Sequence, residues 1–321
     1  MEILVLHPGA LGDVILSLPA LASLHRHFRN PRIAVAGNLD YLPFSAWGHA
    51  ERTLSLSTVP IHRLFSVDPL PERDKTWWRS FDRVVSWSGA DNIDFVRRLA
   101  AVHPSALVSR WKPQRQDIRH VSKIFLDSLR PWVGPSARVQ AEVVTVSPEA
   151  EARGHDWLRD HGWDGRRRIV ALHPGASAAS KRWPVESFVA VARSLASDHG
   201  CGVLVIEGPA EPRLGSQVVL RVDSHNVWLA KSLPIDLLAA ILSLCSAYSG
   251  NDSGVSHMAA ALGLRSVVVF GPTLPEQWAP LGANVTVLRD SRGCLACRLA
   301  DSKGHSCLEN ITPECVLENL L

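Results

Sequence analysis

The five-residue sequence Leu-His-Pro-Gly-Ala occurs twice in this chain of 321 residues, at positions 6–10 and 172–176. The two copies lie about half the chain apart, and each follows a short apolar run of the kind found in buried strands. Apolar residues at helical spacing follow each copy. A strand, a glycine-containing turn and a helix, repeated at this distance, predict two α/β domains of similar construction.

The same alternation continues through both halves. Runs rich in Val, Ile and Leu suit parallel strands buried on both faces, and helical patterns between them imply right-handed β-α-β units. The chain also exceeds the length at which a single core usually stops growing. We therefore predict two doubly wound, Rossmann-like domains facing a central cleft, residues 1–155 and 156–321, with a boundary in the polar stretch 148–168. The expected strands are 32–36, 84–87, 106–109, 202–206, 247–249 and 266–270.

The composition excludes several classes of protein. A formal net charge of +3, with 20% charged and 46% hydrophobic residues, is ordinary for a globular protein and too mild to indicate nucleic-acid binding. The N-terminus lacks the basic region of a secretory signal. The most apolar long segment, 233–248, contains Asp236 and is too short to cross a bilayer, so it predicts a buried or amphipathic helix. We expect a cytoplasmic protein without a nucleic-acid partner.

The first turn, Gly9-Ala10-Leu11-Gly12-Asp13, ends the first strand, where open α/β sheets bind ligands. Its glycines allow a close approach of the backbone, so Gly12 is a candidate acceptor contact. Asp13 lies at or inside the start of a helix, whose dipole stabilises a carboxylate. Asp13 is therefore either a helix-capping residue or a general base directed at a ligand, and spacing alone does not decide between them.

Two polar segments of the second half are suited to phosphate. Lys181 and its basic neighbour precede a helix, where cations and backbone N–H groups neutralise a diphosphate; a solvated loop is the alternative. In the cluster 249–257, Asp252 or Ser253 can cap the following helix, and the N–H groups of Ser253 and Gly254 form an anion site. A Ser253–His257 nucleophile pair would need a third orienting group, so phosphate binding explains this cluster better.

A carboxylate just after the strand 203–206 could hold ribose hydroxyls, and both Glu207 and Glu211 occupy such a position. Either could instead cap a helix. The chain contains no Asp-x-Asp pair, and outside its tail no His-rich metal spacing, so we expect neither a metal nor another cofactor. It also lacks Gly-x-Gly-x-x-Gly, which argues against a dinucleotide-binding dehydrogenase.

The segment 97–138 carries nine Lys or Arg residues against two Asp residues. It is either the landing site of a phosphorylated or membrane-surface acceptor, with Arg110, Arg115 and Arg119 as contacts, or a solvated helix face.

The tail leaves three states open, namely a zinc site, one disulfide or reduced thiols. Its residues are Cys294, Cys297, His305, Cys307 and Cys315.

Together these motifs resemble glycosyltransferase family 9, the bacterial ADP-heptose:lipopolysaccharide heptosyltransferases. The resemblance implies a GT-B fold and an inverting, metal-independent transfer of heptose from ADP-heptose to the inner core of lipopolysaccharide. The alternatives are a family 9 transferase with another sugar or acceptor, a GT-B nucleotide-sugar epimerase and a non-catalytic sugar-nucleotide-binding protein. The matching segments run in order over nearly the whole chain: 9–21, 174–176, 181–184, 208–211, 252–257 and 270–273.

Carried over by position, the resemblance implies a role for each matching residue. Asp13 resembles the general base, Lys181 the ligand of the donor phosphates and Glu211 the ligand of the ribose. The nucleotide-diphosphate loop would consist of Asp252, Ser253, Gly254 and His257. The implied partners are ADP-heptose, a phosphorylated lipopolysaccharide core and, by peripheral contact, the inner membrane. The dipeptide His7-Pro8 departs from the family pattern, since many members carry a basic or small polar residue there.

Overall fold

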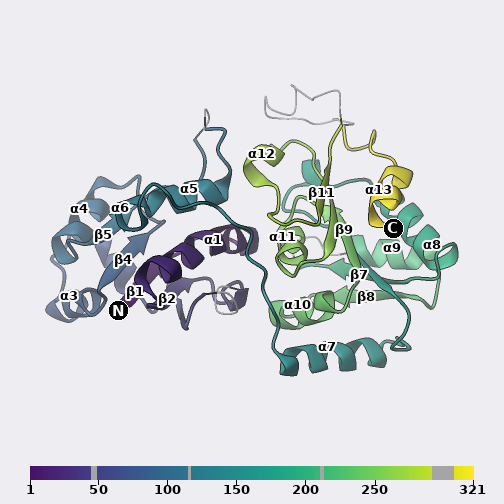
Figure 1. Cartoon of the computed structure of the whole chain (residues 1–321), viewed down its shortest axis with the longest axis horizontal. Helices are drawn as coiled ribbons and strands as arrows, with labels where there is room; N and C mark the ends of the chain where they lie inside the picture. Colours follow the sequence, from purple (N-terminus) through teal and green to yellow (C-terminus); the bar gives the residue numbers. More distant parts are fainter. Residues whose placement is uncertain (45–48, 115–116, 210–212, 291–306) are drawn as a thin grey trace. The chain divides into compact units, whose positions relative to one another are not determined.

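The structure is a computed structural model that describes residues 1–44, 49–114, 117–209, 213–290 and 307–321. The chain forms two compact units, Met1–Glu142 and Val143–Leu321, each with a parallel sheet flanked by helices (Figure 1). The expected boundary at residues 155 and 156 lies inside helix α7 (Pro148–Asp160), which packs against α10 (Ile235–Ser243) of the second unit. A Cβ on Gly154 would lie 2.9 Å from the Ala240 carbonyl carbon, so a glycine permits this close packing.

The first unit contains a five-stranded parallel sheet in the order β3-β2-β1-β4-β5. Central strand β1 is buried on both faces, with Leu4 and Leu6 on the face covered by α3 and α4. Helix α1 packs against α5. The strands are β1 (Glu2–Leu6), β2 (Arg32–Gly37), β3 (Arg52–Ser55), β4 (Arg83–Ser86) and β5 (Ala106–Val108). The helices are α1 (Leu11–Phe28), the 3-10 helix η1 (Pro60–Leu64), α3 (Glu72–Arg79), α4 (Ile93–Val102), α5 (Val121–Ser128) and α6 (Arg130–Val133).

The second unit contains a six-stranded parallel sheet in the order β11-β10-β9-β6-β7-β8. Its strands are β6 (Ile169–His173), β7 (Gly202–Glu207), β8 (Val227–Lys231), β9 (Ala247–Asn251), β10 (Arg265–Val269) and β11 (Val285–Leu288). Besides α7 and α10, its helices are the 3-10 helix η2 (Ala179–Lys181), α8 (Val185–Ser197), α9 (Leu214–Val222), α11 (Gly254–Ala261), α12 (Pro275–Trp278) and α13 (Pro313–Leu320).

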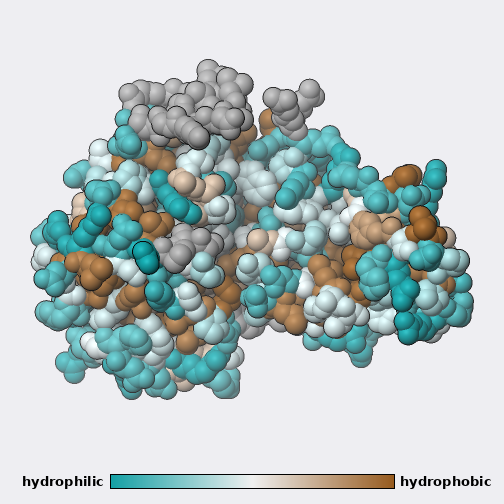
Figure 2. All heavy atoms as spheres, turned by 180° about the vertical axis from the view of Figure 1, so that it is seen from behind, coloured by the Kyte–Doolittle hydropathy of each residue, from teal (hydrophilic) through white to brown (hydrophobic). Residues whose placement is uncertain are grey.

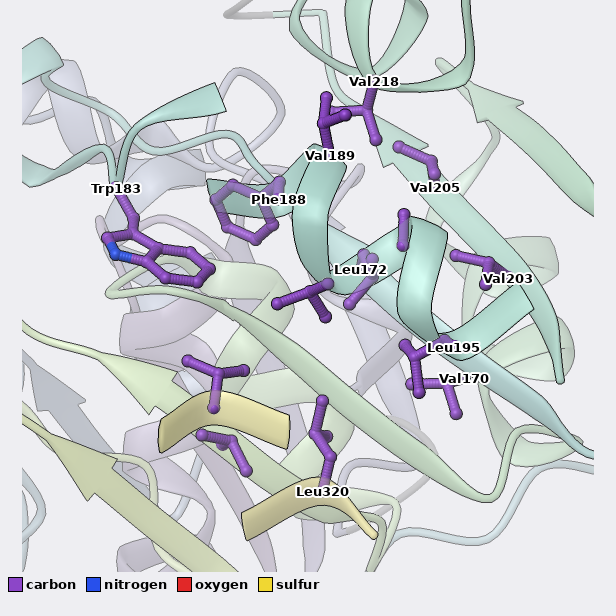
Figure 3. Packing of buried hydrophobic residues seen from close by; sticks show 14 of the residues in the cluster. Val170, Leu172, Trp183, Phe188, Val189, Leu195, Val203, Val205, Val218 and Leu320 are labelled. Carbon is purple, nitrogen blue, oxygen red and sulfur yellow. The ribbon is translucent and has the colours of Figure 1, made fainter. Parts of the chain in front are cut away.

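One hydrophobic core of the second unit lies between the sheet and helices α8, α9 and α13. Figure 3 shows Leu172 of β6 and Phe188 of α8 in this cluster, with Leu320 of α13 entering it from the end of the chain. The Trp183 indole N–H donates to the carbonyl oxygen of Ile311 at 2.9 Å, which ties the segment before α13 to the segment before α8. The residues after 306 that belong to this core are Cys307, Leu308, Ile311, Val316 and Leu320.

No helix among the described ranges is both long and apolar enough to cross a membrane. The apolar segment 233–248 forms the largely buried helix α10 and the first residues of β9, which confirms a buried helix over part of its length. Figure 2 shows one face of the molecule, on which hydrophobic residues form small groups between hydrophilic ones.

Candidate active site

Each sheet has one place where the direction of strand connection reverses. In the second unit, β6 connects through α8 to β7 on one side, and β9 connects through α11 to β10 on the other. In the first unit, β1 and β4 are the corresponding pair. Loops diverge at such points and leave a crevice at the carboxyl ends of the strands. The turn motifs that the sequence singled out, at 7–13, 174–181 and 252–254, follow strands of these pairs.

Lys181 and Asp252 meet at the switch point of the second unit. The Lys181 ammonium donates to Asp252 Oδ2 at 2.8 Å, and the Thr273 hydroxyl donates to the same oxygen at 2.6 Å. Asp252 is 6% exposed, so its charge needs such partners. The carboxylate thus fixes the position of the ammonium group, and direct contact of Asp252 with a phosphate would place two negative charges together.

Ser253 is the residue before α11, and its hydroxyl oxygen lies 3.1 Å from His173 Nδ1, across from the end of β6. Helix α11 begins at Gly254, and the first N–H groups of a helix have no acceptor within it. His257 lies one turn further and is buried. The hydroxyl of Ser253 is therefore held beside His173, a partner that the sequence did not identify.

Asn251 joins the two loops at this switch point. Its side-chain oxygen accepts the backbone N–H of Trp183 at 2.9 Å, and its side-chain amide donates to the carbonyl of Pro174 at 2.9 Å. Asn251 is completely buried. The sequence analysis placed Asn251 in the polar cluster 249–257 but gave it no role. The available signal was a polar residue at the end of a buried strand.

Glu207 is the last residue of β7, and its carboxylate binds Ser216 in the first turn of helix α9. Its Oε2 accepts the N–H and the hydroxyl of Ser216 at 2.8 and 2.9 Å, and its Oε1 lies 3.3 Å from the Lys231 ammonium. Burial raises the pKa of Glu207, but the hydrogen bonds from Ser216 and Lys231 outweigh burial, and its pKa is below the ordinary value. Glu207 therefore stabilises the helix start. Its competitor for the ribose, Glu211, lies outside the described residues.

Asp13 lies in the first turn of α1, where its Oδ2 accepts the Ala10 N–H at 2.8 Å. This is the helix-capping contact that the sequence allowed. The side chain is half-buried, and Gly12 is the second residue of the same helix. Capping fixes the direction of the carboxylate and is compatible with a second role in proton transfer.

Of the eight basic residues of the segment 97–138 that the structure describes, four form ion pairs with acids: Arg110, Arg119, Lys123 and Arg130. Arg110 forms an ion pair with Asp91, and Arg119 contacts Asp117 at 2.6 Å and Asp127 at 3.0 Å. Hydrogen bonds from Arg119 lower the pKa of Asp117. Arg110 and Arg119 are both exposed, and Arg115 lies outside the described residues. An anionic acceptor at this surface would have to replace these carboxylates.

The structure describes two of the four tail cysteines. Cys294, Cys297 and His305 lie outside the described residues, whereas Cys307 is buried and Cys315 half-buried. In the described part of the chain, no group of three His, Cys, Asp or Glu side chains is arranged to hold a metal ion.

His7 directly follows β1 and is 1% exposed. Burial lowers the pKa of His7 from 6.5 to about 4, because a charged imidazolium would lose its hydration. The unfolded chain therefore takes up this proton first as the pH falls. With respect to His7, the free energy of unfolding is at its full value above pH 6.5. It falls as the pH drops below this value and levels off below about pH 4.

We expect the His7→Asn variant to lose less stability than the wild type between pH 7 and pH 4. The full difference in pKa corresponds to about 3 kcal/mol of unfolding free energy at 1.36 kcal/mol per pKa unit. Urea unfolding of both proteins at a series of pH values measures this difference, and other acidic groups cancel in the comparison. Parallel pH dependences in the two proteins would contradict the buried neutral state of His7.

Comparisons with known proteins agree with this architecture. A family model described as glycosyltransferase family 9 (heptosyltransferase) matches residues 107–306. The chain is 23% identical to lipooligosaccharide heptosyltransferase 2 of Campylobacter jejuni, over 100% of the chain and 98% of that protein. It is 30% identical to lipopolysaccharide heptosyltransferase 2 of Escherichia coli, over 48% of the chain and 46% of that protein.

Two solved structures share the fold along nearly their whole length. The ADP-heptose lps heptosyltransferase II of Escherichia coli superposes with a TM-score of 0.77 at 19% identity, over 99% of this chain and 97% of that one. A family 9 glycosyl transferase of Veillonella parvula gives 0.81 at 19% identity, over 99% and 95%. These likenesses establish the GT-B fold. Because the family model covers more than half of the sequence, the chain belongs to glycosyltransferase family 9, the heptosyltransferase family, and is a glycosyltransferase.

Proposed function

We propose that this chain transfers heptose from ADP-heptose to the inner core of lipopolysaccharide, in an inverting reaction that needs no metal. The observation that carries the proposal is the Lys181 ammonium, held by buried Asp252 at the switch point of the second unit. Family membership supports the sugar class, and the relatives named above, which act on lipopolysaccharide or lipooligosaccharide by name, support the acceptor.

The second unit would bind the donor. When the sugar leaves, negative charge develops on the diphosphate, and fixed positive groups stabilise that charge. Lys181 supplies a full positive charge, and the first N–H groups of α11, at Gly254, supply hydrogen-bond donors. Ser253 and His257 would complete this loop, and Glu211 would bind the ribose. Asp252 acts through Lys181, because its Oδ2 is already engaged by that ammonium and by Thr273.

The first unit would bind the acceptor. Asp13 would remove the proton of the acceptor hydroxyl as its oxygen attacks the anomeric carbon opposite the departing ADP. A single displacement of this kind inverts the anomeric configuration. Gly12, which has no side chain, would leave room for the sugar beside the helix start. Arg110 and Arg119 would exchange their present carboxylates for acceptor phosphates, and Arg115 would add a further contact.

Such an acceptor carries a lipid anchor, so we propose that the protein works in the cytoplasm and contacts the inner membrane peripherally. Phosphate-binding arginines of the first unit would then face the polar surface of the membrane. The donor, a soluble sugar nucleotide, needs no such contact.

The test is a transfer assay with purified protein, ADP-heptose and a truncated core acceptor that lacks the heptose. We expect release of ADP, a product heavier by one heptose residue, an inverted anomeric signal in the NMR spectrum and an unchanged rate in excess chelator. Consumption of a different sugar nucleotide would overturn the donor assignment, and loss of activity in chelator would overturn the metal-free mechanism. Interconversion of the sugar nucleotide without acceptor would indicate an epimerase instead.

A further inference from the structure

His7 occupies in the first unit the place that His173 occupies in the second, directly at the end of the central strand. The backbone N–H of Gly9 donates to His7 Nδ1 at 3.1 Å. A ring nitrogen that accepts a hydrogen bond carries no proton, so the neutral imidazole has its proton on Nε2. That Nε2 is buried and has no hydrogen-bond partner among the described residues.

Aromatic rings surround His7 and fix its plane. Phe125 of α5 stacks on the imidazole at a centroid distance of 5.4 Å, and Trp87, which follows β4, meets it edge-on at 5.4 Å. Trp111 lies 6.5 Å away and stacks on Phe125 in turn. The Trp87 indole is itself anchored, since it donates to the Ser128 hydroxyl at 2.8 Å. The imidazole therefore has little freedom to rotate away from the turn.

The turn between His7 and Asp13 has no spare room. A Cβ on Gly9 would lie 2.8 Å from His7 Cε1 and 2.4 Å from Asp13 Cβ, so both side chains pack closely against this glycine, where a Cβ would otherwise lie. The next amide along, that of Ala10, donates to Asp13 Oδ2 at 2.8 Å. Two consecutive amides are thus held by side chains, one by His7 and one by Asp13, and a shift of the first amide moves the second.

Packing alone does not account for a histidine at this position. A buried ring nitrogen without a polar partner is unfavourable compared with an apolar side chain of similar size in the same aromatic cage. The contribution that an apolar residue could not make is the lone pair of Nδ1, which holds the Gly9 amide.

We propose that His7 is a positioning residue for sugar transfer: through the Gly9–Ala10 turn it holds the Asp13 carboxylate in the direction that proton removal requires. The inference rests on the proposed role of Asp13 as the base. His7 acts through the turn and touches no substrate.

The test compares His7→Asn with His7→Leu, because these two side chains have nearly the same shape and differ in polarity. Asparagine places an oxygen on Cγ, where histidine has Nδ1, and can accept the Gly9 N–H; leucine cannot. Both variants lose the ring contacts, so we expect both melting temperatures to fall. We expect H7N to keep a kcat close to that of the wild type and H7L to lose about 10- to 100-fold in kcat, with both KM values unchanged.

A matched control is His103→Leu. His103 is 6% exposed in the same unit, and its Nε2 lies 2.8 Å from the Phe81 carbonyl oxygen, on a different element from the turn. H103L should lower the melting temperature and leave kcat unchanged. Equal kcat values for H7N and H7L would overturn the proposal, and so would a loss in H7L that appears in KM instead of kcat.

One more variant distinguishes a wrong role for His7 from a wrong role for Asp13. Asp13→Asn is measured in the same assay. If D13N is inactive and the two His7 variants turn over equally, Asp13 stands as the base and the role of His7 is wrong. If D13N retains the wild-type rate, the base is wrong, and the His7 proposal falls with it.

Discussion

Asp13→Asn is expected to lower kcat by about 10²- to 10⁴-fold, the range that a positioned general base contributes. Asparagine keeps an oxygen that can accept the Ala10 N–H, so the cap of α1 survives while the ability to take a proton is lost. Donor binding should stay at the wild-type level, since Lys181 and α11 belong to the other unit. Single-turnover rates and titration with ADP measure the two quantities separately.

The control for this variant is Asp94→Asn. Asp94 lies in the first turn of α4, in the same unit, as Asp13 lies in the first turn of α1, but it follows the loop after β4. D94N should retain full activity. A D13N enzyme with a near-normal kcat would show that the carboxylate serves only as a cap.

Lys181→Met is expected to weaken ADP binding and to reduce kcat by about 10²- to 10³-fold, the cost of removing one fixed group from a developing charge. It also leaves the carboxylate of Asp252, which is 6% exposed, with only the Thr273 hydroxyl as a side-chain partner among the described residues. A buried acceptor that loses its partner costs about 1–3 kcal/mol. The melting temperature should therefore fall together with activity.

Two further variants separate these effects. The double variant K181M/D252N removes the stranded charge, so it should regain stability without regaining ADP binding. Lys231→Met breaks an equivalent pair, in which Lys231 lies 3.3 Å from buried Glu207, at the end of β8 and away from the switch point. K231M should lose stability and bind ADP normally. Normal ADP affinity in K181M would remove Lys181 from the donor site.

The inner strands of both sheets were predictable because their residues are buried on both faces and form near-continuous apolar runs. All six strands that the sequence analysis expected by residue range are present, as β2, β4, β5, β7, β9 and β10. The three strands that the sequence did not reveal, β3, β8 and β11, lie at sheet edges. β3 and β11 contain no fully buried residue, so their residues need not be uniformly apolar, and the pattern that marks an inner strand is absent from them. β8 is mostly buried and does carry a short apolar run, 227–230, which the sequence analysis missed.

The residues of the candidate site could be predicted from their types and positions, but their contacts with one another could be predicted only in part. Lys181 and Asp252 were both assigned to phosphate, but their ion pair joins residues 71 positions apart and depends on β6 and β9 being neighbours. The hydrogen bond between Glu207 and Ser216 likewise depends on where helix α9 begins. The charge count of segment 97–138 overstated its positive character, because Asp91, which lies outside the segment, neutralises Arg110.

The core position of the last helix has a consequence for biosynthesis. The first unit contains its own sheet and core, so it can fold while the ribosome is still making the rest. The second unit cannot close its core in the same way, because α13 packs on α8, β9 and β10 and Leu320 enters the cluster. Apolar faces of this unit stay open until α13 leaves the exit tunnel. A nascent chain stalled or cleaved before Ile311 would expose them, which makes it a substrate for chaperones and proteases.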